Sequence, residues 1–291
     1  MSNRVLVLGA TGTLGNPVAR HLAERGHTVR VLARSAEKAR RMFGPAVEVV
    51  AGIAVDRDQI RRAMKGCDAV HISLPPESEF VAVRHIVDLA AAGKLHRVSY
   101  VSATSVCEEN RWFEIIDVKL RAEEALRRSG VPHTVFCPTW VMEVLPNFVK
   151  RNRAVVIVGR NPPGLHFFAA ADFARMVATA YEDERTLGRR LYVHGPESIT
   201  LPNALRTFIA ACHPQHKIMH LKLWQARLIA RLTRQMDFVT RLIGFFDRVG
   251  ELGDPTEANV LLGVPATTLR EWIETRTPIR EGEEAHGEQR S

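Results

Sequence analysis

The chain of 291 residues is poor in cysteine and in aromatic side chains, and it contains no long apolar run. Its four cysteines are widely separated and form no C-x-x-C pair, which argues against a disulfide framework and against a cysteine-based metal site. No segment approaches the roughly 18 consecutive apolar residues that a membrane-spanning helix needs, and nothing near the N-terminus resembles a signal peptide. From these absences we expect a cytoplasmic protein without a bound metal.

The charge is unbalanced, because 40 lysines and arginines face 32 acidic residues and leave a formal net charge of +8. Such an excess attracts nucleic acids, membrane surfaces or anionic small molecules. The arginines do not alternate with aromatic residues, and no nucleic-acid motif is present, so we expect no nucleic-acid partner. A small molecule is the partner that we expect instead.

What the sequence does contain, close to its beginning, is an apolar segment that leads directly into three glycines spaced three apart. Pro17 and the apolar spacing after it predict that a helix follows. A strand, a glycine turn and a helix N-terminus bring free backbone N–H groups and the positive end of the helix dipole to one point. The sequence therefore predicts a dinucleotide site. Its predicted diphosphate contacts are Gly9, Thr11, Gly12, Thr13, Leu14 and Gly15.

The second predicted strand, residues 28–33, ends at the position that reads the ribose of the cofactor. An acidic side chain there would accept hydrogen bonds from the ribose hydroxyls of NAD. This chain has Arg34 and Ser35 instead, and further basic residues follow. Since a guanidinium binds a 2′-phosphate through paired, charge-assisted hydrogen bonds, the sequence predicts NADP(H) in preference to NAD(H).

Strands and helices alternate over the first half of the chain, which is typical of a doubly wound parallel sheet. We therefore expect an α/β fold with a Rossmann-like, NADP(H)-binding domain over residues 1–150, a smaller mixed α/β substrate lobe over 151–277 and a disordered tail over 278–291. Strands are predicted at 47–50, 68–73, 97–101, 132–138, 154–158 and 190–193. Helices are predicted at 59–64, 77–92, 112–128, 172–181 and 201–212. The segments after residue 150 are assigned to the smaller lobe.

Residues 221–249 predict one long amphipathic helix or a broken pair, in which arginines alternate with a stripe of large apolar side chains. Leaving that stripe in water would expose an improbably large patch. A lid over the substrate cleft is the interpretation that we favour. A homodimer interface and a membrane surface that attracts the basic face are the alternatives.

Several motifs resemble the short-chain dehydrogenase/reductase superfamily and, within it, the atypical NmrA-like branch. The glycine turn carries the resemblance to the superfamily, and the similarity covers about residues 4–275. It implies a Rossmann-like domain with NADP(H) and a substrate cleft built largely by the C-terminal half. The further motifs are Lys119-Leu-Arg-Ala-Glu123-Glu-Ala-Leu126, Ser129-Gly130-Val-Pro-His-Thr134, Pro138-Thr-Trp-Val-Met-Glu143, Asp172-Phe-Ala-Arg and Gly195-Pro-Glu-Ser-Ile-Thr200.

The resemblance also implies roles for single residues. Many superfamily enzymes use a tyrosine four residues before the helix lysine as proton donor, and here Lys119 is present while Ile115 stands at the tyrosine position. In NmrA-like reductases the lysine often takes the acid/base part, so Lys119 is the predicted catalytic residue, with ribose positioning as the alternative. Other implied cofactor contacts are Ser73, Leu74, Pro75, Ser102, Ala103, Pro138, Thr139 and Trp140. Implied substrate contacts are Thr104, Trp140, Met142, Asn147 and His166.

Three functions fit these features. The first, which we favour, is an NADPH-dependent reductase that transfers a hydride to a small apolar substrate, aromatic or conjugated, such as a quinone or an enone. The second is a non-catalytic NADP(H)-binding redox sensor, which the isoleucine at position 115 suggests. The third, a sugar-nucleotide epimerase or dehydratase, is weaker because those enzymes usually need the missing tyrosine.

Overall fold

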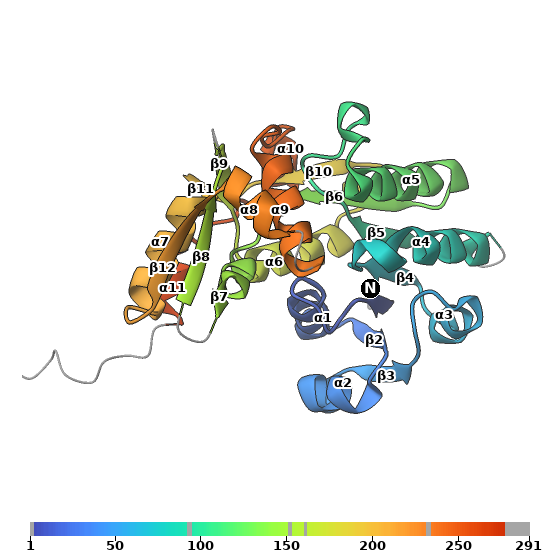
Figure 1. Ribbon diagram of the computed structural model, residues 1–291. Coiled ribbons are helices and arrows are strands. Elements are labelled where there is room, and N and C mark those ends of the chain that lie inside the picture. The colour runs from blue at the N-terminus through green and yellow to red at the C-terminus, as the bar shows by residue number, and fades with distance from the viewer. Residues whose placement is uncertain (1–2, 92–94, 151–152, 160–161, 231–233, 277–291) are drawn as a thin grey trace, which may run out of the picture.

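The computed structural model describes residues 3–91, 95–150, 153–159, 162–230 and 234–276. At its centre is a seven-stranded sheet in the order β10-β6-β5-β4-β1-β2-β3, with every neighbouring pair parallel (Figure 1). The strand order reverses between β1 and β4, and the carboxyl ends at such a reversal are where doubly wound folds bind ligands. The strands are β1 (Arg4–Leu8), β2 (Thr28–Ala33), β3 (Glu48–Ala51), β4 (Ala69–Ile72), β5 (Arg97–Val101), β6 (His133–Pro138) and β10 (Arg190–Val193).

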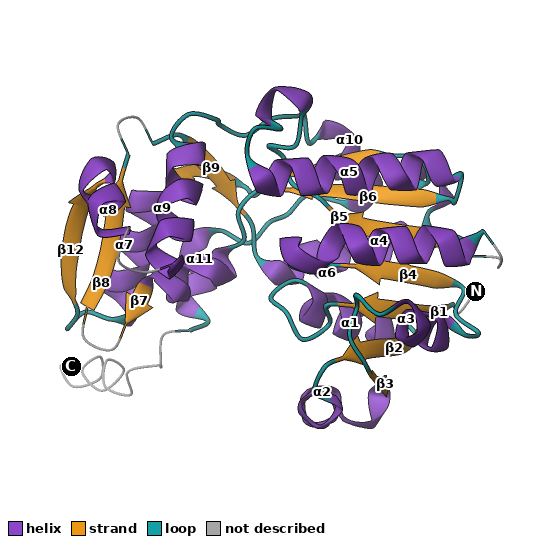
Figure 2. Cartoon of the chain, turned by 45° about the vertical axis from the view of Figure 1, so that its right-hand side comes forward, coloured by secondary structure: helices purple, strands orange, loops and turns teal. Residues whose placement is uncertain are grey.

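Helices cover both faces of this sheet (Figure 2). The apolar strand β1 explains why, since its residues 5–8 are completely buried and need an apolar layer on either side. One face carries α1 (Gly15–Glu24), α2 (Ala36–Phe43), α6 (Ala170–Glu182) and α10 (Thr256–Leu262). The other carries α3 (Arg57–Met64), α4 (Pro76–Ala90) and α5 (Glu114–Ser129). The predicted Rossmann-like α/β class is confirmed.

A second lobe lies beside the carboxyl ends of the strands (Figure 1). Its three-stranded sheet has the order β12-β8-β7, and β11 and β9 form a separate antiparallel pair. Its strands are β7 (Val149–Lys150), β8 (Arg153–Val158), β9 (Gly164–Phe167), β11 (Glu197–Thr200) and β12 (Lys217–Lys222). Its helices are α7 (Leu201–Cys212), α8 (Leu223–Ala230), α9 (Arg234–Phe246) and α11 (Leu269–Glu274). Short 3₁₀ helices occur at Gly44–Ala46, Glu108–Asn110, Met142–Phe148 and Glu184–Thr186.

The predicted strand at 190–193 and the predicted helix at 172–181, both assigned to the smaller lobe, belong to the main domain instead, as does α10. β10 pairs with β6 as the seventh strand, and α6 packs against α1 and the sheet. The assignment was wrong because the local pattern identifies a strand or a helix without naming its partner. The chain thus leaves the sheet after β6, builds part of the second lobe and then returns.

The segment 221–249 is a broken pair of helices, α8 and α9, and its first predicted helical residue, Leu221, belongs to β12. Its apolar residues do not form one buried stripe: Phe245 is buried, whereas Trp224 and Leu228 are 58% and 57% exposed. Residues 231–233 and the predicted tail at 278–291 lie outside the described residues. None of the described helices combines the length and the apolar character needed to cross a bilayer.

Candidate cofactor and substrate site

The glycine turn after β1 is exposed at Thr11, Gly12 and Thr13, directly before α1. Gly9 has a φ of +82°, and a Cβ at this position would lie 1.9 Å from the carbonyl oxygen of Ser73. A Cβ at Gly15 would lie 2.2 Å from the carbonyl oxygen of Gly9. Only glycine fits at these two positions, as the sequence predicts.

Gly12 differs from the other two glycines. It donates a hydrogen bond to the carbonyl oxygen of Gly9 at 2.9 Å, and a Cβ there would meet only that oxygen, at 3.2 Å. Within the described residues, the N–H groups of Thr11, Thr13 and Leu14 have no backbone acceptor. An exposed bare backbone with free N–H groups at a helix N-terminus fits a diphosphate.

Arg34 lies at the carboxyl end of β2, exposed to solvent. In the part of the chain that the structure describes, its guanidinium has no hydrogen-bond or ion-pair partner. Ser35 is the N-cap of α2, and its hydroxyl accepts a hydrogen bond from the N–H of Lys38 at 3.3 Å. Arg34 is therefore free to bind an anion, while the Ser35 hydroxyl already caps a helix.

The end of β4 supports the glycine turn from the other side. Ser73 donates its N–H to the carbonyl oxygen of Leu8 at 3.1 Å, and its own carbonyl lies against Gly9. Ser73 and Leu74 are half-buried, and Pro75 precedes α4. Ser73 and Leu74 therefore border the turn through their backbone, and the contacts of these residues and of Pro75 with the cofactor stay a prediction.

Lys119, on α5, is held by two acceptors. Its Nζ donates to Oε1 of Glu79 at 2.7 Å and to the carbonyl oxygen of Val101, the last residue of β5, at 3.0 Å. The Lys119 side chain is 13% exposed, and that of Glu79, on α4, is 1% exposed. Burial and the charge of Glu79 raise the pKa of neighbouring Tyr100 well above its usual range. The sequence analysis did not predict Glu79 as a site residue, because no short pattern relates it to a lysine 40 positions later in the chain.

The residues after β5 lie partly under α9. Ser102 and Thr104 are buried, and the Ser102 hydroxyl donates to Glu123. Ala103 and Ile115 pack into an apolar cluster with Phe245 and its neighbours. The position at which many superfamily members carry a tyrosine is therefore filled by an aliphatic side chain in apolar surroundings.

Glu251 joins the end of β6 to the second lobe. Its Oε1 accepts hydrogen bonds from the Thr139 hydroxyl and, at 2.6 Å, from the backbone N–H of His166, while Oε2 lies 2.6 Å from Nδ1 of the same histidine. The predicted residues Thr139 and His166 are thus brought together by a carboxylate that the sequence analysis missed. Glu251 lies in a loop without a recognisable pattern, so no sequence signal pointed to it.

Within the described chain, one trio of His, Cys or acidic residues has donor atoms all within 4.8 Å of one another: His166, His194 and Glu251. The two imidazole rings stack with centroids 5.4 Å apart, and burial lowers the pKa of His194 below its usual value. Both Glu251 oxygens already accept hydrogen bonds, so hydrogen bonding accounts for this arrangement.

The remaining predicted residues are spread around the end of β6. Pro138 is buried, and Trp140 packs edge-on against Phe246, with ring centroids 5.0 Å apart. Met142 is only 1% exposed and belongs to the core of the second lobe, so it packs rather than lining a surface. Asn147 is exposed at the far end of the 3₁₀ helix that begins at Met142.

Comparison with known proteins agrees with this geometry. Residues 9–184 match the model of a family described as NAD(P)H-binding. A (4-alkanoyl-5-oxo-2,5-dihydrofuran-3-yl)methyl phosphate reductase of Streptomyces griseus is 35% identical over 203 residues, which cover 67% of this chain and 69% of that protein. Two similar solved structures, both under 20% identical in sequence, share the fold.

The first of these structures is a triphenylmethane reductase of Citrobacter sp. complexed with NADP(H), with a TM-score of 0.75, 17% identity and coverage of 95% of this chain and 100% of that one. The second is an NADPH-dependent quinone oxidoreductase of Escherichia coli complexed with NADPH, with a TM-score of 0.74, 19% identity and coverage of 93% and 99%. The chain therefore belongs to the NAD(P)H-binding family, in the NmrA-like branch of the atypical short-chain dehydrogenases/reductases, and is an NAD(P)H-dependent oxidoreductase.

Proposed function

We propose that the protein is an NADPH-dependent reductase that transfers a hydride to a small, largely apolar, conjugated acceptor such as an enone or a quinone. The observation that carries the proposal is the pairing of an exposed glycine turn with a cationic, nearly buried Lys119 at the end of β5. When bound, the nicotinamide supplies the hydride. The chain's residues bind and orient the two reactants and exclude water.

Lys119 is suited to one specific task. An ammonium group has three N–H donors, and Glu79 and the Val101 carbonyl take two of them. The third donor is left for a ribose hydroxyl or for the oxygen of the reduced acceptor. The buried Glu79 carboxylate and the Val101 carbonyl fix the direction of the ammonium group, and a proton donor needs such a fixed position.

The surroundings of the strand ends favour an apolar acceptor. Trp140, Ile115 and the aromatic end of α9 lie around them, and we place the substrate there under the second lobe. Two of the similar proteins support the same substrate class, because one is a reductase of an unsaturated furanone that carries a phosphate and the other is a quinone oxidoreductase. An unsaturated furanone and a quinone are both conjugated rings.

Cofactor choice gives a prediction of its own. Replacing Arg34 by alanine should weaken NADPH binding about 10- to 100-fold, because it removes charge-assisted hydrogen bonds to the 2′-phosphate. NADH binding should change less than about threefold, since NADH lacks that phosphate. The matched control is Arg41→Ala, whose guanidinium is held by Glu37 at 2.5 Å. Titration of both cofactors checks the result, and equal losses for NADPH and NADH would show that Arg34 does not bind the phosphate.

Turnover separates the proposal from the redox-sensor alternative, which Ile115 in its apolar cluster favours. The test is oxidation of NADPH, followed at 340 nm, with a panel of quinones, enones and aromatic ketones. The reductase proposal expects saturable oxidation with at least one conjugated acceptor. Tight NADPH binding without oxidation by any compound would support a sensor.

A further inference from the structure

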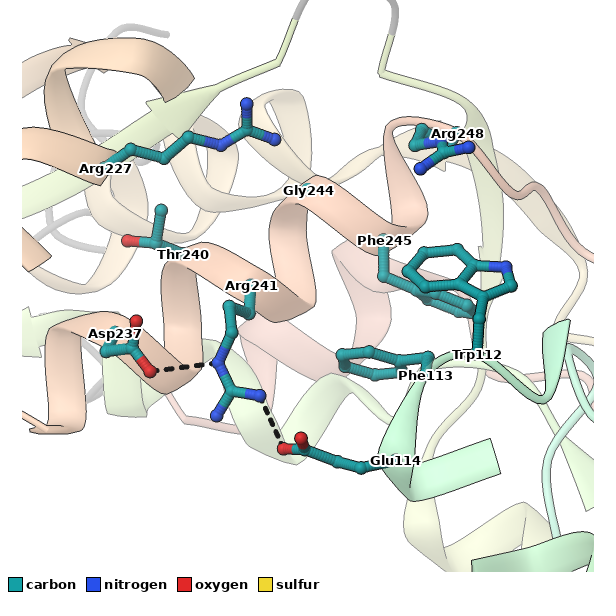
Figure 3. Close-up of a pocket in the computed structure, with 10 residues that line it drawn as sticks. All are labelled: Trp112, Phe113, Glu114, Arg227, Asp237, Thr240, Arg241, Gly244, Phe245 and Arg248. Atoms are coloured by element: carbon teal, nitrogen blue, oxygen red, sulfur yellow. Dashed lines mark hydrogen bonds and ion pairs between the residues drawn. The ribbon is translucent and has the colours of Figure 1, made fainter. Parts of the chain in front are cut away.

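A cavity of about 320 Å³ lies between the N-terminal end of α5 and one face of α9 (Figure 3). Three aromatic residues line it: Trp112, Phe113 and Phe245. The rings of Phe113 and Phe245 stack with centroids 4.5 Å apart, and both belong to the apolar cluster that contains Ala103 and Ile115. The cavity therefore borders the apolar cluster that packs against Ala103, close after the end of β5.

Three guanidinium groups line the same cavity, and they differ in whether an acidic side chain neutralises them. Arg241 is neutralised, because it binds Glu114 at 2.6 Å and Asp237 at 2.9 Å. Arg227 and Arg248 have no acidic partner among the residues that the structure describes. Arg248 instead lies over the ring of Trp112, 4.9 Å from its centroid. The cavity thus holds two exposed positive charges that nothing in the described chain balances.

The face of α9 between these arginines carries only small side chains. Gly244 lies there, and a Cβ on it would come within 3.1 Å of Nη2 of Arg227. Thr240, one turn earlier on the same face, also lines the cavity, is 2% exposed and has a hydroxyl without a hydrogen-bond partner in the described residues. A small residue, a spare hydroxyl and two unpaired guanidinium groups are the components of an oxyanion-binding site.

We propose that this cavity binds the phosphate monoester group of an aromatic or conjugated substrate. A phosphate monoester carries up to two negative charges, which match Arg227 and Arg248, and the aromatic side chains cover the ring that bears it. The proposal rests on the proposed function, since it names the substrate class of the same site. The cavity is lined by residues of α5, α8 and α9, whereas Arg34, which is assigned to the phosphate of the cofactor, follows β2, and Figure 1 shows β2 apart from those helices.

The first test is binding at equilibrium, which needs no turnover. The full chain, loaded with NADP⁺, is titrated by calorimetry with phenyl phosphate, phenol and inorganic phosphate, and the tryptophan fluorescence of the protein, to which Trp112 contributes, is followed in parallel. We expect phenyl phosphate to bind at least about tenfold more tightly than either fragment, because ring and phosphate are recognised together. Equal affinity for phenyl phosphate and phenol, or for phenyl phosphate and inorganic phosphate, would overturn the proposal.

The variants assign the binding to the two arginines. Arg227→Ala and Arg248→Ala should each weaken phenyl phosphate binding about tenfold and leave NADPH binding unchanged. Arg270→Ala is the matched control, because that side chain is 88% exposed on α11 and removes the same charge elsewhere. An equal loss in the control, or no loss in both cavity variants, would contradict the assignment. Both cavity arginines are exposed, so their replacement leaves the core intact.

Turnover then distinguishes this inference from the proposed function. A hydroxymethyl-substituted unsaturated furanone and its phosphate ester are compared as acceptors for NADPH. We expect a higher kcat/KM for the ester in the wild type and a loss of that preference in Arg227→Ala/Arg248→Ala. Specific phenyl phosphate binding without reduction of either acceptor would support the cavity and contradict the reductase. Equal reduction of both acceptors would support the reductase and contradict the phosphate site.

Discussion

Replacing Gly12 by valine should weaken NADPH binding more than about 100-fold while the fold is retained. The Cβ would meet only the carbonyl oxygen of Gly9, at 3.2 Å, which a small backbone adjustment relieves. The two methyl groups would then occupy the space through which a diphosphate reaches the free N–H groups of the turn. Fluorescence titration with NADPH and a thermal melt without cofactor measure the two effects separately.

Gly9→Ala is the matched contrast to this variant. It should lower the melting temperature itself, because its Cβ would lie 1.9 Å from the carbonyl oxygen of Ser73 and φ is +82°. Gly9→Ala would thus lower the stability of the fold, whereas Gly12→Val would weaken only the binding of NADPH. If Gly12→Val bound NADPH within about threefold of the wild type, the diphosphate would not lie against this turn.

Lys119→Met should reduce kcat about 100-fold or more, because it removes the ammonium group that lies against the last residue of β5, where it can give a proton or hold the ribose. It should also destabilise the fold by about 3–5 kcal/mol, since it leaves the buried Glu79 carboxylate without its partner at 2.7 Å. Loss of activity in this single variant is therefore ambiguous. Steady-state kinetics and urea unfolding must be measured on the same preparation.

The double variant Lys119→Met/Glu79→Gln resolves the ambiguity. It removes both buried charges, so most of the lost stability should return while kcat stays low. Glu79→Gln alone should keep activity within about tenfold, because the ammonium remains at the end of β5. Recovery of activity together with stability in the double variant would show that Lys119 is structural only.

The sequence was most informative where the physics is local. The glycine turn and the buried strand β1 both follow from short patterns, and the structure places them as predicted. The long-range relations could not be predicted in this way. Lys119 meets Glu79 only because α4 and α5 pack side by side, and Glu251 reaches Thr139 from a loop 112 residues later in the chain.

Asp172 illustrates the same limit at a single residue. Its position predicts a helix cap, but α6 begins at Ala170 and has Ala169 as its N-cap, so Asp172 lies within the first turn. Its carboxylate instead accepts hydrogen bonds from the N–H groups of Ala266 and Thr267. The prediction of a cap is therefore wrong, and Asp172 instead links α6 to the segment that follows α10. A local rule identified the residue as structural but gave the wrong partner.

The central claim is that the hydride of NADPH passes to a conjugated carbon acceptor on this protein. The most direct measurement uses NADPH deuterated at either hydrogen of the nicotinamide C4, with mass spectrometry of the reduced furanone or enone. We expect one of the two labelled cofactors to place a single deuterium in the product, since a fixed nicotinamide exposes one face to the substrate. NADPH binding without transfer of label from either form to the carbon of any furanone, enone or aromatic ketone, and without oxidation of NADPH by any quinone, would contradict the account.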